Sequence, residues 1–95
     1  MTVKLTDAAR RMLQREYRTI PEKPIRIKYH NVSCAACQRV LELVLDKADA
    51  DDELFTTEEG YTFCCARFIS QQADTFTIDA AGGIPIITPR NRISL

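Results

Sequence analysis

Apolar residues recur at helical spacing near the start of the chain and predict one amphipathic helix. Between residues 5 and 17 they fall on one face, whereas the arginines fall mostly on the other. Thr6 is the expected N-cap, and Asp7 suits the positive end of the helix dipole. Pro21 and Pro24 should end this helix and begin an extended stretch.

Alternating apolar and polar residues in the rest of the chain predict short, half-buried strands. The pattern is clearest at residues 25–29, where Arg26 falls on the polar side. Further strands are expected at residues 41–45, 54–55, 61–65, 75–79 and 84–87, a short helix at 67–73, and turns at 59–60 and 82–83. A helix at residues 41–45 remains an alternative because Leu and Glu favour one, and Pro85 should break the last strand. One helix followed by about six short strands predicts a mainly β, α+β fold of two packed sheets.

Length and composition favour one ordinary globular domain spanning residues 1–95. The chain is 45% hydrophobic and 27% charged, which excludes a disordered tail, a collagen-like chain and a coiled coil. No apolar run approaches the length of a bilayer-spanning helix, and the first residues lack the apolar stretch of a secretory signal. We therefore expect a cytoplasmic protein that does not engage membranes.

Charge is balanced overall but unevenly distributed, with 13 basic and 13 acidic residues in total. Residues 1–30 hold eight basic and three acidic side chains, and residues 31–95 hold five and ten. This balance argues against nucleic-acid binding. The basic helix is expected to be a solvated face rather than a docking site for an acidic partner. The acidic stretch at residues 46–53 lacks the spacing of a calcium loop and predicts a solvated turn.

The four cysteines carry the most specific chemical signal. In an intracellular chain they suggest metal or redox chemistry before structural disulfides. Cys34 and Cys37 form a C-x-x-C motif, whose two intervening residues let both thiolates reach one ion from a turn. Thiolate pairs suit iron, zinc or an iron–sulfur cluster. Cys34 and Cys37 are therefore the candidate metal and cluster ligands.

The other candidate ligands are weaker. Cys64 and Cys65 are neighbours on a predicted strand, so their side chains point to opposite faces and at most one of them can join the C-x-x-C motif. Both are better interpreted as small apolar core residues. His30, the single histidine, is a possible ligand or proton acceptor near Cys34, although a solvent-facing position is favoured.

A thioredoxin-like protein with a Cys34–Cys37 redox pair is the main alternative. That geometry requires a helix at residues 38–45, at whose N-terminus a thiol pKa would fall. The sequence lacks the aromatic-Cys-Gly-Pro-Cys signature, and its predicted strands do not alternate with helices. Phosphate-loop, dinucleotide and nucleophile-elbow motifs are absent as well, so the chain is not expected to be an enzyme.

The order of segments resembles the HesB-like, or IscA-type, iron–sulfur cluster biosynthesis domain. The matching segments are Leu5–Ala9, Lys23–Ile27, Cys34, Leu43–Asp46, Asp51–Phe55, Gly60–Phe63 and Thr77–Asp79. The resemblance implies two small mixed sheets packed as a compact sandwich or barrel with flanking helices. It also implies binding of iron or an iron–sulfur cluster for delivery to acceptor or assembly proteins, often by a homo-oligomer.

The sequence departs from this family at its ligand positions. Scaffold members use a cysteine in a Gly-Cys-Ser-Gly loop and a C-terminal Cys-Gly-Cys, whereas residues 33–37 read Ser-Cys-Ala-Ala-Cys and residues 88–95 contain no cysteine. Only Cys34 therefore carries over. The missing ligands could come from Cys37 with Cys64 or Cys65, or from two C-x-x-C segments in a homodimer. A HesB-like interaction domain without any ligand is the remaining alternative.

Overall fold

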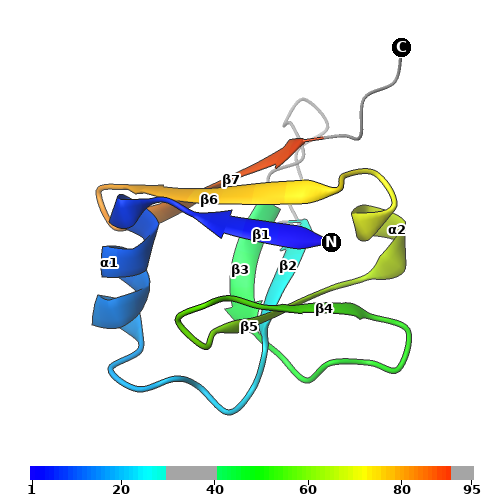
Figure 1. The fold of residues 1–95 in the computed structure, drawn as a ribbon, viewed down its shortest axis with the longest axis horizontal. Coiled ribbons are helices and arrows are strands. Elements are labelled where there is room, and N and C mark those ends of the chain that lie inside the picture. The colour runs from blue at the N-terminus through cyan, green and yellow to red at the C-terminus, as the bar shows by residue number, and fades with distance from the viewer. Residues whose placement is uncertain (30–40, 91–95) are drawn as a thin grey trace.

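The structure, a computed structural model, describes residues 1–29 and 41–90. These residues form seven strands and two helices, arranged as two small sheets (Figure 1). In chain order the elements are β1 (Thr2–Leu5), α1 (Asp7–Glu16), β2 (Ile25–Tyr29), β3 (Leu41–Leu45), β4 (Glu53–Thr56), β5 (Thr62–Cys65), α2 (Arg67–Ser70), β6 (Thr75–Ala81) and β7 (Ile84–Arg90).

Both sheets mix parallel and antiparallel pairs, which confirms the expected fold class. The three-stranded sheet has the order β1-β6-β7, with β1 parallel and β7 antiparallel to β6. The four-stranded sheet has the order β3-β2-β5-β4, in which only β2 and β5 run parallel. The helix considered for residues 41–45 is wrong, because these residues form β3 and pair along their whole length with β2.

Helix α1 begins as expected. The Thr6 hydroxyl accepts the Ala9 N–H at 3.2 Å and so satisfies one of the free donors of the first turn. Ala9, Met12 and Leu13 bury the apolar face. The helix ends at Glu16, well before the two prolines, because Tyr17 is extended. Residues 2–5 were not expected to form a strand, and they do so by pairing with β6.

The core lies between the two sheets and α1. Its largest side chains with almost no exposed surface come from four elements, α1, β2, β5 and β6: Leu13, Ile25, Ile27, Phe63, Phe76 and Ile78. The inward positions of Phe76 and Ile78 agree with the alternation of apolar and polar residues in β6. Burial of a large apolar side chain contributes roughly 1.5–3 kcal/mol, so this cluster is the main source of stability.

Strand β7 is not broken by Pro85, contrary to expectation. The Arg90 carbonyl accepts the Asp74 N–H at 3.1 Å, so the peptide groups of even-numbered residues in β7 face β6. Pro85 and Pro89 are odd-numbered, and their nitrogens face the open edge of the sheet, where the ladder needs no donor. The turn before β7 was expected, and Gly82 and Gly83 both adopt positive φ there.

Neither α1 nor α2 is long and apolar enough to cross a membrane, and residues 1–29 and 41–90 contain no other helix.

Candidate functional site

The candidate ligands Cys34 and Cys37, together with His30, lie outside the described residues. The structure does define the two points between which these residues are held. Tyr29 is the last residue of β2, Leu41 is the first of β3, and the two are direct partners in the antiparallel ladder. The segment that carries the C-x-x-C motif therefore leaves and re-enters the fold at one end of the four-stranded sheet.

An apolar recess of about 470 Å³ lies at this end of the molecule. The described residues that line it are Tyr29, Leu41, Ile69, Gln72, Ala73, Phe76 and Pro89. At its rim the Tyr29 hydroxyl donates to Gln72 Oε1 at 2.9 Å and links the end of β2 to the connection before β6. None of these side chains is charged and none is a cysteine or histidine, so the recess suits an apolar group better than an ion.

Cys64 and Cys65 lie far from solvent, and both are fully buried. Cys65 is the register partner of Ile27 and belongs to the hydrophobic core, whereas Cys64 is the partner of Arg26 and points to the other face of the sheet. This arrangement confirms that the two side chains diverge and that they act as small apolar residues.

Burial also makes both thiols chemically quiet. Burial raises the pKa of the Cys64 thiol, and the adjacent Arg26 only partly opposes this effect. Burial together with the neighbouring Cys64 and Asp52 raises the pKa of Cys65 to about 12. Because the thiolate is both the nucleophile and the metal ligand, neither cysteine is prepared for either task at neutral pH.

Arg26 is the clearest departure from the sequence-based expectation, because it is buried instead of solvent-facing. Its Nε donates to Asp46 Oδ2 at 2.8 Å, and its Nη2 donates to Asp52 Oδ2 at 2.7 Å and to the Lys47 carbonyl at 2.9 Å. The side chain of Asp52 is only 5% exposed. The interpretation of residues 46–53 as a solvated turn is therefore wrong for Asp52, whereas the Asp46 side chain, which also binds Arg26, is 53% exposed.

These contacts fix the charges of the network. The Arg26 guanidinium holds the pKa of Asp52 below its usual range, and the Asp49 N–H, which also donates to Asp52, lowers that pKa further. In return, the hydrogen bond that Arg26 donates to Asp52 raises the pKa of Arg26. The network therefore holds the turn against β2, and the charge of Arg26 is compensated by the carboxylates that bind it. Its role is structural.

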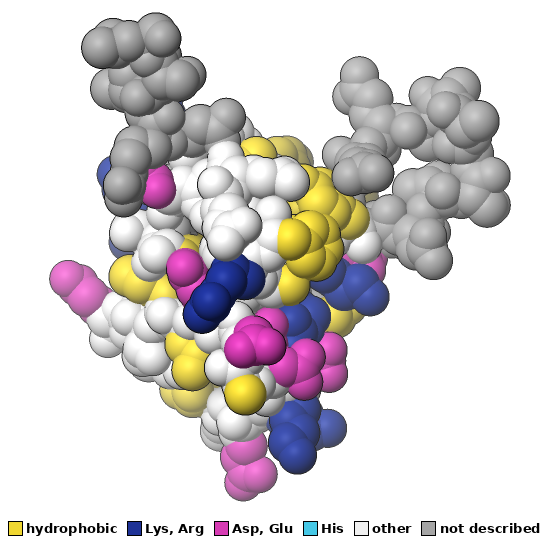
Figure 2. All heavy atoms as spheres, turned by 90° about the vertical axis from the view of Figure 1, so that its right-hand side faces the viewer, with side chains coloured by type: hydrophobic (Ala, Val, Ile, Leu, Met, Phe, Trp, Pro, Cys, Tyr) yellow, Lys and Arg dark blue, Asp and Glu magenta, His cyan; other side chains and the backbone are white. Residues whose placement is uncertain are grey.

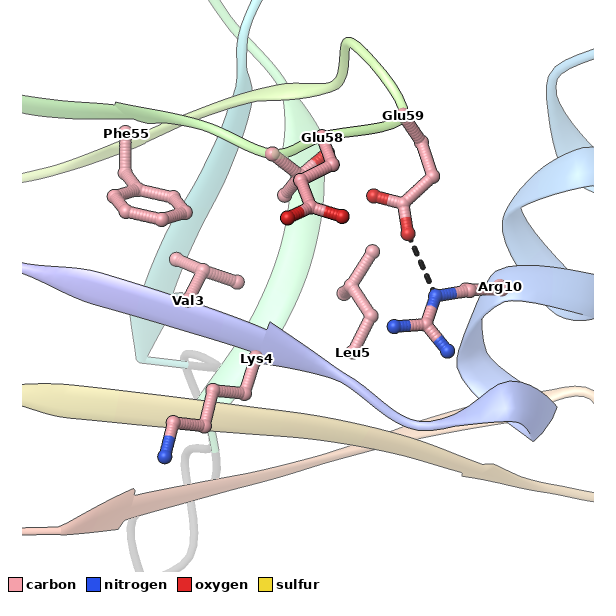
Figure 3. Close-up of a pocket in the computed structure, with 8 residues that line it drawn as sticks. Val3, Lys4, Leu5, Arg10, Phe55, Glu58 and Glu59 are labelled. Atoms are coloured by element: carbon pink, nitrogen blue, oxygen red, sulfur yellow. Dashed lines mark hydrogen bonds and ion pairs between the residues drawn. The ribbon is translucent and has the colours of Figure 1, made fainter.

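A second recess of about 390 Å³ lies between β1 and the β4–β5 hairpin (Figure 3). Val3, Leu5 and Phe55 form its apolar wall, and Arg10 and Glu59 lie at its edge. Arg10 Nε donates to Glu59 Oε1 at 2.6 Å. The recess contains no cysteine or histidine, and its principal charges pair with each other.

No group of three or more metal-ligating side chains occurs in the part of the chain that the structure describes. Three carboxylates of the acidic turn, those of Asp46, Asp49 and Asp52, are directed at Arg26. The described residues therefore provide no metal site of their own, and the candidate thiol pair remains outside them.

Comparison with known proteins gives one clear result, which concerns the fold. No family model and no curated protein matches the sequence. Among solved structures, Escherichia coli SufA, described as involved in the biosynthesis of iron–sulfur clusters, is similar with a TM-score of 0.58 at 23% identity, over 99% of this chain and 83% of SufA. IscA, described with its [2Fe-2S] cluster, is similar with a TM-score of 0.59 at 19% identity, over 95% of this chain and 82% of IscA. The chain thus has the HesB/IscA-like fold that its sequence resembles.

Proposed function

We propose that this protein carries iron or an iron–sulfur cluster, ligates it through Cys34 and Cys37, and delivers it to acceptor proteins without catalysing a reaction. The main support is the structural similarity to SufA and IscA, which extends over nearly the whole chain. SufA is described as involved in iron–sulfur cluster biosynthesis, and IscA is described with a [2Fe-2S] cluster. Fold alone does not fix function, so the chemistry of the cysteines carries the rest.

The choice of Cys34 and Cys37 is supported by elimination among four cysteines. Cys64 and Cys65 are buried on opposite faces of β5 and have raised thiol pKa values. The C-x-x-C spacing of the remaining pair suits joint ligation of one soft metal. The paired positions of Tyr29 and Leu41 hold the two ends of the segment that carries this pair side by side.

Two thiolates do not complete a cluster whose irons usually take four cysteine ligands. Burial argues against recruitment of Cys64 or Cys65, because their exposure would require opening the four-stranded sheet. Two copies of the chain would supply four thiolates from two C-x-x-C segments. We therefore expect the loaded form to be a homodimer that shares one cluster, with no resident cofactor in either subunit alone.

A thiol–disulfide function for the same pair receives less support. The thioredoxin-like geometry required a helix at residues 38–45, and residues 41–45 form β3 instead. The thiolate-stabilising helix N-terminus is therefore missing from the described part of this region.

Anaerobic reconstitution with ferrous iron and sulfide tests the proposal. The wild-type protein should gain visible absorbance with matching iron and sulfide content, and Cys34→Ser or Cys37→Ser should abolish both. Cys64→Ala is the matched control, because it removes a thiol from the structured core and should leave loading intact. Loading that survives in both serine variants would overturn the assignment. A reversible dithiol–disulfide couple with no metal uptake would favour the redox alternative.

A further inference from the structure

The exposed side of α1 carries arginines that have no acidic partner. Arg11 and Arg15 are exposed on the helix, and Arg18 is exposed just beyond its C-cap. We call these three residues the arginine ridge. None of them forms an ion pair within residues 1–29 and 41–90. Residues 30–40 and 91–95 contain no Asp or Glu, so these segments offer no carboxylate side chain either.

Arg10, next to the ridge in the same helix, differs from the ridge arginines because it has acidic partners. It pairs with Asp7 Oδ1 at 2.7 Å and with Glu59 Oε1 at 2.6 Å. Asp7 and Glu59 are therefore already engaged by Arg10, and Glu16, which follows Arg15 in the helix, forms no ion pair with the ridge among the described residues. A favourable interaction with the helix dipole accounts for Arg15 in the last turn, but not for Arg11 in the middle or Arg18 outside the helix.

The identity of these residues narrows the type of ligand. All three are arginines, and the planar guanidinium binds carboxylates through two parallel hydrogen bonds, which a lysine ammonium cannot reproduce. Three cations on a chain of zero net charge are too few for the broad basic surface of a nucleic-acid binder. A short carboxylate-rich segment of a protein fits the size and chemistry of the ridge.

The position of the ridge argues against a second copy as the natural occupant. Helix α1 lies at one end of the molecule, and the acidic turn between β3 and β4 lies toward the other end (Figure 1). The face opposite to α1 carries acidic and basic side chains beside one another (Figure 2). Three carboxylates of this turn, those of Asp46, Asp49 and Asp52, are already directed at Arg26 of their own chain, so they are poorly available to the ridge of a second copy.

We propose that the arginine ridge is a docking surface for an acidic segment of a different protein. This surface lies on α1, whereas the C-x-x-C segment leaves the fold between β2 and β3, so the two sites act independently. The positive ridge and the acidic turn lie at different ends of the protein, so the electric field of an acidic partner orients the protein. This orientation accelerates the association of the two proteins at low salt.

A fluorescein-labelled hexaglutamate peptide serves as the probe in a fluorescence anisotropy titration. Binding should weaken as salt rises. Arg11→Glu and Arg15→Glu should each weaken it by about threefold to fivefold, the range of a single exposed ion pair. Lys47→Glu is the matched control, since it makes the same charge change at an exposed site in the acidic turn and should leave binding unchanged. Circular dichroism confirms that all three variants are folded.

Three results would overturn this inference. Equal weakening by Lys47→Glu would show attraction by overall charge and not by the ridge. Equally tight binding of a twelve-residue oligothymidylate, lost in the same variants, would assign the ridge to nucleic acid. Self-association in sedimentation experiments that Arg15→Glu abolishes would make a second copy the occupant. Cluster loading is measured on the same variants and should be unaffected, so failure of the carrier proposal is distinguishable from failure of this one.

Discussion

Arg26 and Asp52 form a buried ion pair, with Nη2 and Oδ2 2.7 Å apart and side chains that are 10% and 5% exposed. The pair joins the centre of the four-stranded sheet to the acidic turn beside Cys64. Its two residues are 26 positions apart in the chain.

Removal of one partner from this pair should destabilise the protein strongly. Asp52→Asn leaves Arg26 paired with Asp46 but gives it a weaker acceptor at position 52, and the loss of a hydrogen bond between charged groups typically costs about 1.5–3 kcal/mol. Urea denaturation followed by circular dichroism measures the free energy of unfolding. Asp51→Asn is the control, because that carboxylate is exposed and its loss should cost less than about 0.5 kcal/mol. Equal stability of the two variants would show that the pair contributes nothing.

The same pair predicts how stability depends on pH. The pKa of Asp52 is lowered in the folded state, so the unfolded chain binds a proton there at a higher pH than the folded protein does. The stabilisation is fully present above the ordinary carboxyl pKa of about 4 and is lost as pH falls toward the lowered folded value. The unfolding free energy of the wild-type protein should therefore fall more steeply below pH 4 than that of Asp52→Asn. Parallel pH profiles for the two proteins would contradict this origin.

The buried cysteines should resist thiol reagents. In a Cys34→Ser/Cys37→Ser background at pH 8, Ellman's reagent should detect almost no free thiol until urea unfolds the chain, after which Cys64 and Cys65 should both react. The reason is that neither side chain has exposed surface and burial raises both thiol pKa values. Rapid reaction of either thiol in the folded protein would mean that the four-stranded sheet opens readily.

Thr6 should contribute to stability through two bonds of its hydroxyl group. It accepts the Ala9 N–H at the start of α1 and donates to Asp79 Oδ1 on β6 at 2.7 Å. Thr6→Ala should lower the free energy of unfolding by about 1–2 kcal/mol, and Thr6→Ser should retain most of it. Thermal denaturation of both variants provides the measurement. An equal loss in Thr6→Ser would attribute the effect to the methyl group and not to the hydroxyl.

Local sequence patterns predicted the elements whose signals lie within a few residues. The alternation around Ile25 and Phe76 located β2 and β6, and the adjacent positions of Cys64 and Cys65 predicted their opposite faces. The patterns failed where a distant partner decides the outcome. β1 is four residues long and forms because β6 pairs with it, and Pro85 fits within β7 because its nitrogen faces an open edge.

At the candidate site, too, local patterns predicted correctly and contacts between distant residues were missed. Arg26 alternates with apolar neighbours and was therefore expected to face solvent, but carboxylates 20 and 26 residues away stabilise it inside the fold. Similarly, nothing close to Arg10 in sequence indicates Glu59, 49 residues away. The C-x-x-C motif, in contrast, is a local signal, and it remains the basis of the proposed ligand set.

The most direct test of the carrier proposal is the iron and sulfide content per chain after anaerobic reconstitution, measured together with the mass in solution. The proposal predicts about one [2Fe-2S] cluster per two chains, in a dimer, for the wild-type protein and for Cys64→Ala. It predicts no cluster and no dimer for Cys34→Ser/Cys37→Ser. A full complement of iron and sulfide in that double variant would contradict it.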